Sequence, residues 1–106
     1  MGEVLLTAVD NTREIELDEG DRVTIRLDEN LTTGYAWETD SLDEALLELI
    51  SNVHRQDSPG IGMGGTREVV LQAVRRGQGQ LCLRLRRSWD PPNTEADRFE
   101  VRVSIG

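Results

Sequence analysis

The segment "RVTIRL", residues 22–27, decides the fold because its side chains alternate strictly between polar and apolar types. Val23, Ile25 and Leu27 share one face, and the intervening arginine and threonine side chains share the other. Side chains of period two are typical of a β-strand with one face against a core and the other in solvent. We therefore expect this segment to be a strand of a two-layered β-structure.

The same alternation recurs further along the chain. Leucines at every second position mark residues 81–85, and apolar side chains at every second position mark residues 99–105. A short apolar run over residues 3–9 is expected to form an edge strand. Turn-forming residues separate the runs, at 30–34, 58–65, 77–79 and 90–93. Short strands with such turns predict an antiparallel β-sandwich, and 106 residues are the usual size of a single domain, here 1–106.

One segment departs from the strand pattern. The sequence Ser41-Leu42-Asp43-Glu44 has the form of a helix-capping box. The apolar residues behind it can share a helical face. We expect a short helical turn there, followed by a strand through Val53 and Arg55. The residues of the expected helical face are Ala45, Leu46, Leu49 and Ile50.

Composition excludes several classes of function. The formal net charge of −8 argues against nucleic acid as a partner, because phosphate binding needs clustered cations. A single cysteine excludes an internal disulfide and a cysteine-based zinc site. His54 with Asp57 is a weak metal or acid–base hint, but a ligand shell needs more partners than this neighbourhood shows. No cofactor, metal or catalytic residue is expected. No run of residues is long and apolar enough to suggest a membrane partner.

The stretch "GIGMGG", residues 60–65, matches the G-x-G-x-x-G fingerprint of dinucleotide-binding proteins. That fingerprint must open a helix, whose N-terminal N–H groups then face the phosphates. Here the β-branched pair Val69-Val70 and the alternation around it indicate a strand instead. The glycines are therefore interpreted as a loop whose backbone makes a close contact.

The two tryptophans have different expected roles. Trp37 lies at strand spacing from Tyr35, which favours packing in the core. Trp89 lies among charged residues and prolines, in a segment expected to be a loop. An exposed tryptophan favours a binding role. Cys82 falls on the arginine-bearing face of its strand and is expected to be partly exposed.

Three motifs together carry a family resemblance. The segments "ENLTTGYAWE" (29–38), "GIGMGGTRE" (60–68) and "RRSWDPP" (86–92), with the closing "ADRFEVRVSI" (96–105), resemble the chagasin-type inhibitors of papain-like cysteine peptidases. The resemblance implies an all-β, immunoglobulin-like antiparallel β-sandwich with its binding loops clustered at one end. It implies a reversible, competitive inhibitor that blocks the peptidase cleft with loops 29–35, 59–66 and 86–92, and not an enzyme.

The resemblance also assigns the peptidase-binding residues. Two departures from the family pattern, Leu31 and Ser88, stand where the family usually has proline. Proline fixes φ and lowers the ordering cost of a loop, so affinity is the property these departures put in question. The assigned residues are Asn30, Leu31, Thr32, Thr33, Gly34 and Tyr35 in the first loop, Gly62, Met63, Gly64 and Gly65 in the second, and Arg87 and Trp89 in the third.

Each loop has an expected role in the cleft. Thr32 and Thr33 would lie near the catalytic Cys–His pair without offering a scissile carbonyl. Met63 would fill an apolar subsite, because its side chain is flexible and polarizable. Trp89 would lie against an apolar rim. Arg87 has two open interpretations, an ion pair with the enzyme or one with an acidic residue of its own domain.

The alternative function is an immunoglobulin-like adhesion or carbohydrate-binding module that uses the same Trp89, and an enzyme comes a distant third. The free protein is expected to be a monomer. The compartment stays open: the chain begins without the basic and apolar pattern of an export signal. The resemblance favours a periplasmic or secreted protein if such a signal was trimmed, and a cytoplasmic one otherwise. The glycosylation sequon Asn30-Leu31-Thr32 is explained more simply by the first-loop motif.

Overall fold

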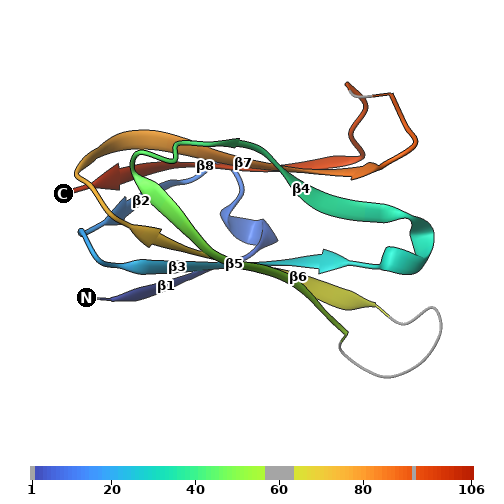
Figure 1. The fold of residues 1–106 in the computed structure, drawn as a ribbon, viewed down its shortest axis with the longest axis horizontal. Coiled ribbons are helices and arrows are strands. Elements are labelled where there is room, and N and C mark those ends of the chain that lie inside the picture. The colour runs from blue at the N-terminus through green and yellow to red at the C-terminus, as the bar shows by residue number, and fades with distance from the viewer. Residues whose placement is uncertain (1, 57–63, 92) are drawn as a thin grey trace.

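The computed structural model describes residues 2–56, 64–91 and 93–106. Its strands form two four-stranded sheets that face each other as a sandwich (Figure 1). In spatial order, the first sheet contains β1 (Glu3–Leu6), β3 (Arg22–Glu29), β6 (Gly65–Ala73) and β5 (Leu47–Gln56). The second contains β2 (Glu14–Leu17), β8 (Asp97–Ile105), β7 (Gly77–Arg87) and β4 (Tyr35–Leu42). Two short 3₁₀ turns, η1 (Ala8–Asp10) and η2 (Leu31–Thr33), complete the elements.

The strand pairing confirms the predicted sandwich, with one difference in direction. The four pairs among β3 to β8 are antiparallel, as expected, but β1 pairs with β3 and β2 pairs with β8 in parallel. The connectivity explains the first parallel pair. Strand β2 follows β1 in the chain but belongs to the second sheet, so the chain crosses the sandwich before β3 returns to the first sheet in the direction of β1. The edge strand expected over residues 3–9 is confirmed for its first half, and η1 follows it.

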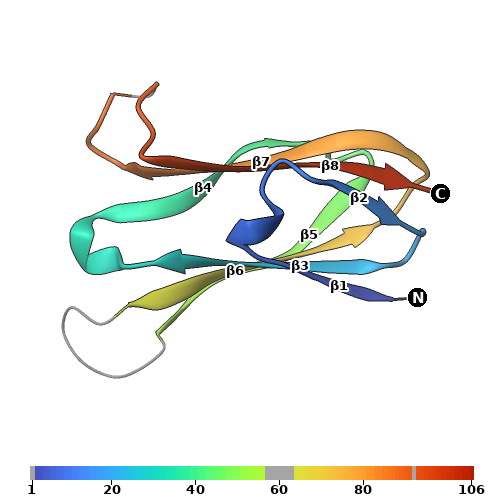
Figure 2. The same ribbon diagram turned by 180° about the vertical axis from the view of Figure 1, so that it is seen from behind.

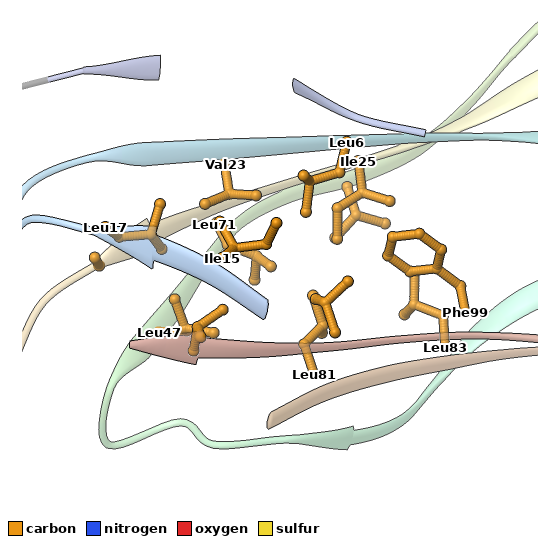
Figure 3. Packing of buried hydrophobic residues seen from close by; sticks show 14 of the residues in the cluster. Leu6, Ile15, Leu17, Val23, Ile25, Leu47, Leu71, Leu81, Leu83 and Phe99 are labelled. Carbon is orange, nitrogen blue, oxygen red and sulfur yellow. The ribbon is translucent and has the colours of Figure 1, made fainter. Parts of the chain in front are cut away.

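The buried apolar side chains of both sheets point into the space between the sheets (Figure 3). Ile25 is fully buried, and Val23 and Leu27 beside it are 2% exposed, as the alternation of residues 22–27 predicts. Phe99 is the largest fully buried side chain. Trp37 is also in this core, and its Nε1 donates to the carbonyl oxygen of Asp28 at 2.9 Å. The prediction of core packing for Trp37 is confirmed.

The short helical turn expected after the capping-box sequence is confirmed, but the helical face assigned to Leu49 and Ile50 is wrong. Strand β4 continues to Leu42, and a single turn follows, in which the N–H groups of Leu46 and Leu47 both donate to the carbonyl oxygen of Asp43. Leu46 packs where Gly77 and Gly79 have no Cβ, and this contact holds the turn against the core. The predicted strand through Val53 and Arg55 is confirmed as part of β5. Leu49 and Ile50 therefore lie in an edge strand, half-exposed, and not on a helix.

Cys82 is buried, contrary to the partial exposure expected from its position on the polar face. It pairs across the strands with Glu100, and Arg98 of β8 forms ion pairs with Glu100 and Asp40. Long charged side chains of neighbouring strands thus leave the thiol with no exposed surface. Removal from water disfavours the thiolate and raises the pKa of Cys82 to about 11.

This pKa has a measurable consequence for stability at alkaline pH. The unfolded thiol ionises near its ordinary pKa of 9.0, whereas the folded thiol stays protonated up to about pH 11. The unfolded state then binds fewer protons, so the free energy of unfolding falls with rising pH across this window. A shift of this size corresponds to about 3 kcal/mol. Chemical denaturation at pH 8 and pH 11 measures the loss of unfolding free energy between the two pH values, which should be smaller for Cys82→Ala than for the parent. An equal loss in the two proteins would contradict the raised pKa of Cys82.

Candidate functional site at the loop end of the sandwich

The connections β3 to β4 and β7 to β8 lie at one end of the sandwich with the adjoining ends of β5 and β6, and the two termini lie at the other (Figures 1 and 2). The first connection, β3 to β4, crosses from one sheet to the other; the connections β5 to β6 and β7 to β8 each stay within a sheet. Strand register brings their ends together, since Gly65 pairs with both Glu29 and Gln56, and Tyr35 pairs with Arg87. The loops expected at residues 29–35, 59–66 and 86–92 correspond to these three connections.

The first loop is held by its own side chains. Asn30 caps η2: its Oδ1 accepts from the N–H of Thr32 at 3.1 Å and from the Thr32 hydroxyl at 2.6 Å. The Thr33 hydroxyl donates to the carbonyl oxygen of Asn30 at 2.7 Å and accepts from the N–H of Tyr35 at 3.3 Å. These bonds fix the turn without a proline at position 31. Thr32, Thr33 and Leu31 are left facing solvent.

Gly34 joins the first loop to the third. Its φ is +84°, a left-handed conformation that favours glycine. A Cβ at this position would overlap the indole of Trp89. The ring of Trp89 therefore lies directly on the backbone of the first loop, while 67% of the residue stays exposed.

Arg87 organises the third loop from within the domain. Its Nε donates to Asp90 Oδ2 at 2.9 Å, and this bond raises the pKa of the Arg87 guanidinium above its ordinary value. The same guanidinium lies 4.9 Å from the ring centroid of Tyr35 and 5.6 Å from that of Trp89. Of the two interpretations left open for Arg87, the structure shows the internal ion pair. These contacts order a loop that lacks the family's proline at position 88.

The second loop is described only at its end. Gly62 and Met63 lie outside the described residues. Gly64 has open space where a Cβ would stand. Gly65 is buried instead, and a Cβ there would come within 2.6 Å of the His54 ring. Gly65 thus permits a close internal approach, in addition to any contact with a partner.

A buried polar cluster below the first two loops was missed by the sequence analysis. Glu29 Oε2 accepts from the backbone N–H of Trp37 at 2.6 Å, and Glu29 Oε1 lies 2.7 Å from His54 Nδ1. Arg67 NH2 lies 2.9 Å from the same Oε1. We call Glu29, His54, Arg67 and the Trp37 N–H the Glu29 cluster. The sequence contained a sign of this cluster: Glu29 lies on the inward-facing side of β3, whose remaining inward-facing residues are all apolar.

Other site chemistries find no support in the part of the chain that the structure describes. His54, considered above with Asp57 as a weak metal hint, is engaged by Glu29, and Asp57 lies outside the described residues. Among the described residues, no group of three or more histidine, cysteine or acidic side chains is arranged to hold a metal ion. The same residues contain no helix of the length and apolar character that crossing a membrane would require.

The geometry defines a class of protein: an immunoglobulin-like β-sandwich in which the ends of β3 to β8 that flank the three expected loops lie together at one end. The chain belongs to the chagasin family of peptidase inhibitors I42, whose family model matches residues 16–103. By family it is thus a peptidase inhibitor and not an enzyme, which confirms the class expected from the motifs.

Individual relatives agree with this assignment. Amoebiasin-1 of Entamoeba histolytica is 35% identical over 101 residues, which cover 94% of this chain and 97% of that protein. The crystal structure of the cysteine protease inhibitor EhICP2 from Entamoeba histolytica superposes with a TM-score of 0.91 at 21% identity, over 100% of this chain and 97% of that one. PbICP-C in complex with falcipain-2 superposes with a TM-score of 0.69 at 13% identity, over 100% of both chains. The two structural likenesses show the fold.

The two loop glycines Gly34 and Gly64 allow a matched test of the geometry. Gly34→Ala forces an unfavourable φ and displaces Trp89, so the free energy of unfolding should fall by about 1–2 kcal/mol or more. Gly64→Ala adds a methyl group in open space and should change it by less than about 0.5 kcal/mol. Urea denaturation measures both values. Equal effects at the two positions would contradict the contact between Gly34 and Trp89.

Proposed function

We propose that the chain blocks the cleft of papain-like cysteine peptidases reversibly and competitively with loops 29–35, 59–66 and 86–92. The observation that carries this proposal is the seating of exposed Trp89 on Gly34, beside exposed Thr32 and Thr33. First and third loops thereby offer one continuous surface, with hydroxyl groups and a backbone turn next to an aromatic face. Such a surface fits a cleft that has a polar catalytic centre and apolar walls.

The conformation of the first loop explains how it would block the enzyme without being cleaved. A peptidase of this type binds its substrate as an extended segment, with a carbonyl presented to the nucleophile. Here the carbonyl oxygen of Asn30 already accepts from both the N–H and the hydroxyl of Thr33, within a 3₁₀ turn. Cleavage would require this turn to open. Thr32 and Thr33 would then occupy the catalytic centre as small side chains of a closed loop.

Trp89 is the proposed anchor of the interface. Its large exposed ring is already fixed against Gly34 and beside the guanidinium of Arg87, so little freedom remains to be lost on binding. Preorganised aromatic side chains of this kind commonly dominate the binding free energy of an interface. The remaining assigned residues, among them Leu31, Tyr35 and Gly64, would complete the fit around it.

Steady-state inhibition of papain with a fluorogenic peptide tests the proposal. Raising the substrate concentration should restore the rate, whereas trypsin should be unaffected at the same inhibitor concentration. Trp89→Ala should weaken inhibition by about 2 kcal/mol, roughly thirtyfold, because it removes an aromatic side chain that the proposed complex buries. The matched control is Val74→Ala, which truncates an exposed apolar side chain between β6 and β7, at the opposite end of the sandwich from the three loops. It should leave inhibition unchanged.

Two results would overturn the proposal. One is inhibition that substrate cannot reverse, which would indicate a site outside the cleft or a covalent product. The other is a parent protein that leaves papain fully active while a thermal scan shows it folded. A Trp89→Ala variant as potent as the parent would remove the third loop from the interface.

A further inference from the structure

We propose that the Glu29 cluster is a positioning element, which holds the first loop and the base of the second loop at Gly64 and Gly65 in one fixed relation for peptidase binding. This inference rests on the proposed function, and it adds Glu29, His54 and Arg67 as residues that act on binding without touching the peptidase. It explains why a charged group stands on the inward phase of a strand that is otherwise apolar there.

The carboxylate of Glu29 joins the four strands that carry the two loops. It belongs to β3, it accepts from the Trp37 N–H of β4, and it contacts His54 of β5 and Arg67 of β6. Strands β3 and β4 begin and end the first loop, and β5 and β6 do the same for the second. One side chain therefore connects both sheets and both loop bases.

Burial makes these contacts demanding in geometry. The Glu29 side chain has no exposed surface, while His54 and Arg67 are 15% and 17% exposed. A buried carboxylate is tolerated only if its oxygens are fully bonded, and an apolar group of similar size is often as favourable for stability. Apolar contacts between the two sheets have no preferred direction, whereas hydrogen bonds have narrow ranges of distance and angle. The cluster thus restricts the relative placement of the strand ends more than an apolar core would.

The cluster lies immediately next to the residues that it would position. Glu29 precedes Asn30, whose side chain caps η2. The His54 ring lies against Gly65, and Gly64, the preceding residue, belongs to the second loop. A shift of the carboxylate or of the imidazole would therefore move the base of a loop by a similar amount.

A second ion cluster on the same strands provides a matched control. Glu68 of β6 lies 3.1 Å from Arg26 of β3 and 3.2 Å from Arg55 of β5. It also pairs a glutamate with arginine and joins three of the same strands. However, it lies on the outer face of the first sheet and contacts neither β4 nor a loop residue in these pairs. A general effect of lost ion pairs would appear equally in both clusters.

Two variants test the cluster. Glu29→Gln with Arg67→Met removes the charge and its surplus donors together, and it keeps an acceptor for Trp37. His54→Phe keeps a ring beside Gly65 and removes the hydrogen bond to Glu29; it carries the test if the double variant does not fold. The control is Glu68→Gln with Arg55→Met. Papain inhibition is measured for each, and amide exchange of Thr32, Gly34 and Gly64 is followed by NMR in the free proteins.

Both cluster variants should raise the inhibition constant about tenfold, equivalent to about 1.4 kcal/mol, mainly through slower association. Exchange of the three loop amides should rise by a similar factor, because the loops sample more conformations. The control should stay within twofold of the parent in both measurements. Because exchange is measured without peptidase, a parent that fails to inhibit papain would overturn the proposed function while loop exchange still decides the role of the cluster.

The inference is wrong if the cluster variants fold and keep both the loop exchange and the inhibition constant of the parent within twofold. It is also wrong if the control variant loses as much as they do. Either result would mean that the Glu29 cluster contributes to the stability of the fold but does not position the loops.

Discussion

The buried carboxylate of Glu29 is the interaction on which the loop end of this molecule depends. The core between the two sheets consists of apolar side chains, which fill space but have no directional preference. At the loop end, the last inward-facing residue of β3 is the charged Glu29. The neighbouring strands surround its carboxylate with a backbone N–H, an imidazole and a guanidinium. The apolar core thus changes to a polar network where the loops begin.

In the first and third loops, local bonds supply order at the positions where proline was expected. In the first loop the side chains of Asn30 and Thr33 close a 3₁₀ turn, and in the third Arg87 joins Asp90 and two aromatic rings. Leu31 and Ser88, which replace the expected prolines, therefore do not imply unstructured loops. Contact between Trp89 and Gly34 then makes the first and third loops one surface, and the glycine is required by φ and by space alike.

Sequence alone predicted the sandwich, because alternation with period two reports directly on a one-sided core, as residues 22–27 and 99–105 show. It also predicted different surroundings for Trp37 and Trp89 from their neighbours in sequence. It predicted the turn after Asp43 but failed for Leu49 and Ile50, whose helical spacing was overridden by pairing of β5 with β6. It failed for Cys82 because side chains from adjacent strands cover it. The Glu29 cluster joins residues 25 and 38 positions apart, and local patterns do not report such pairing.

The most direct test of the account is the hydrogen-exchange footprint of this protein bound to papain. If the three loops enter the cleft, peptides spanning residues 30–35, 64–66 and 87–91 should lose exchange on binding. Peptides from the turns near the termini, around residues 18–21 and 74–77, should exchange as in the free protein. Protection at those turns or along the β5 edge, with unchanged exchange in the loops, would contradict the account.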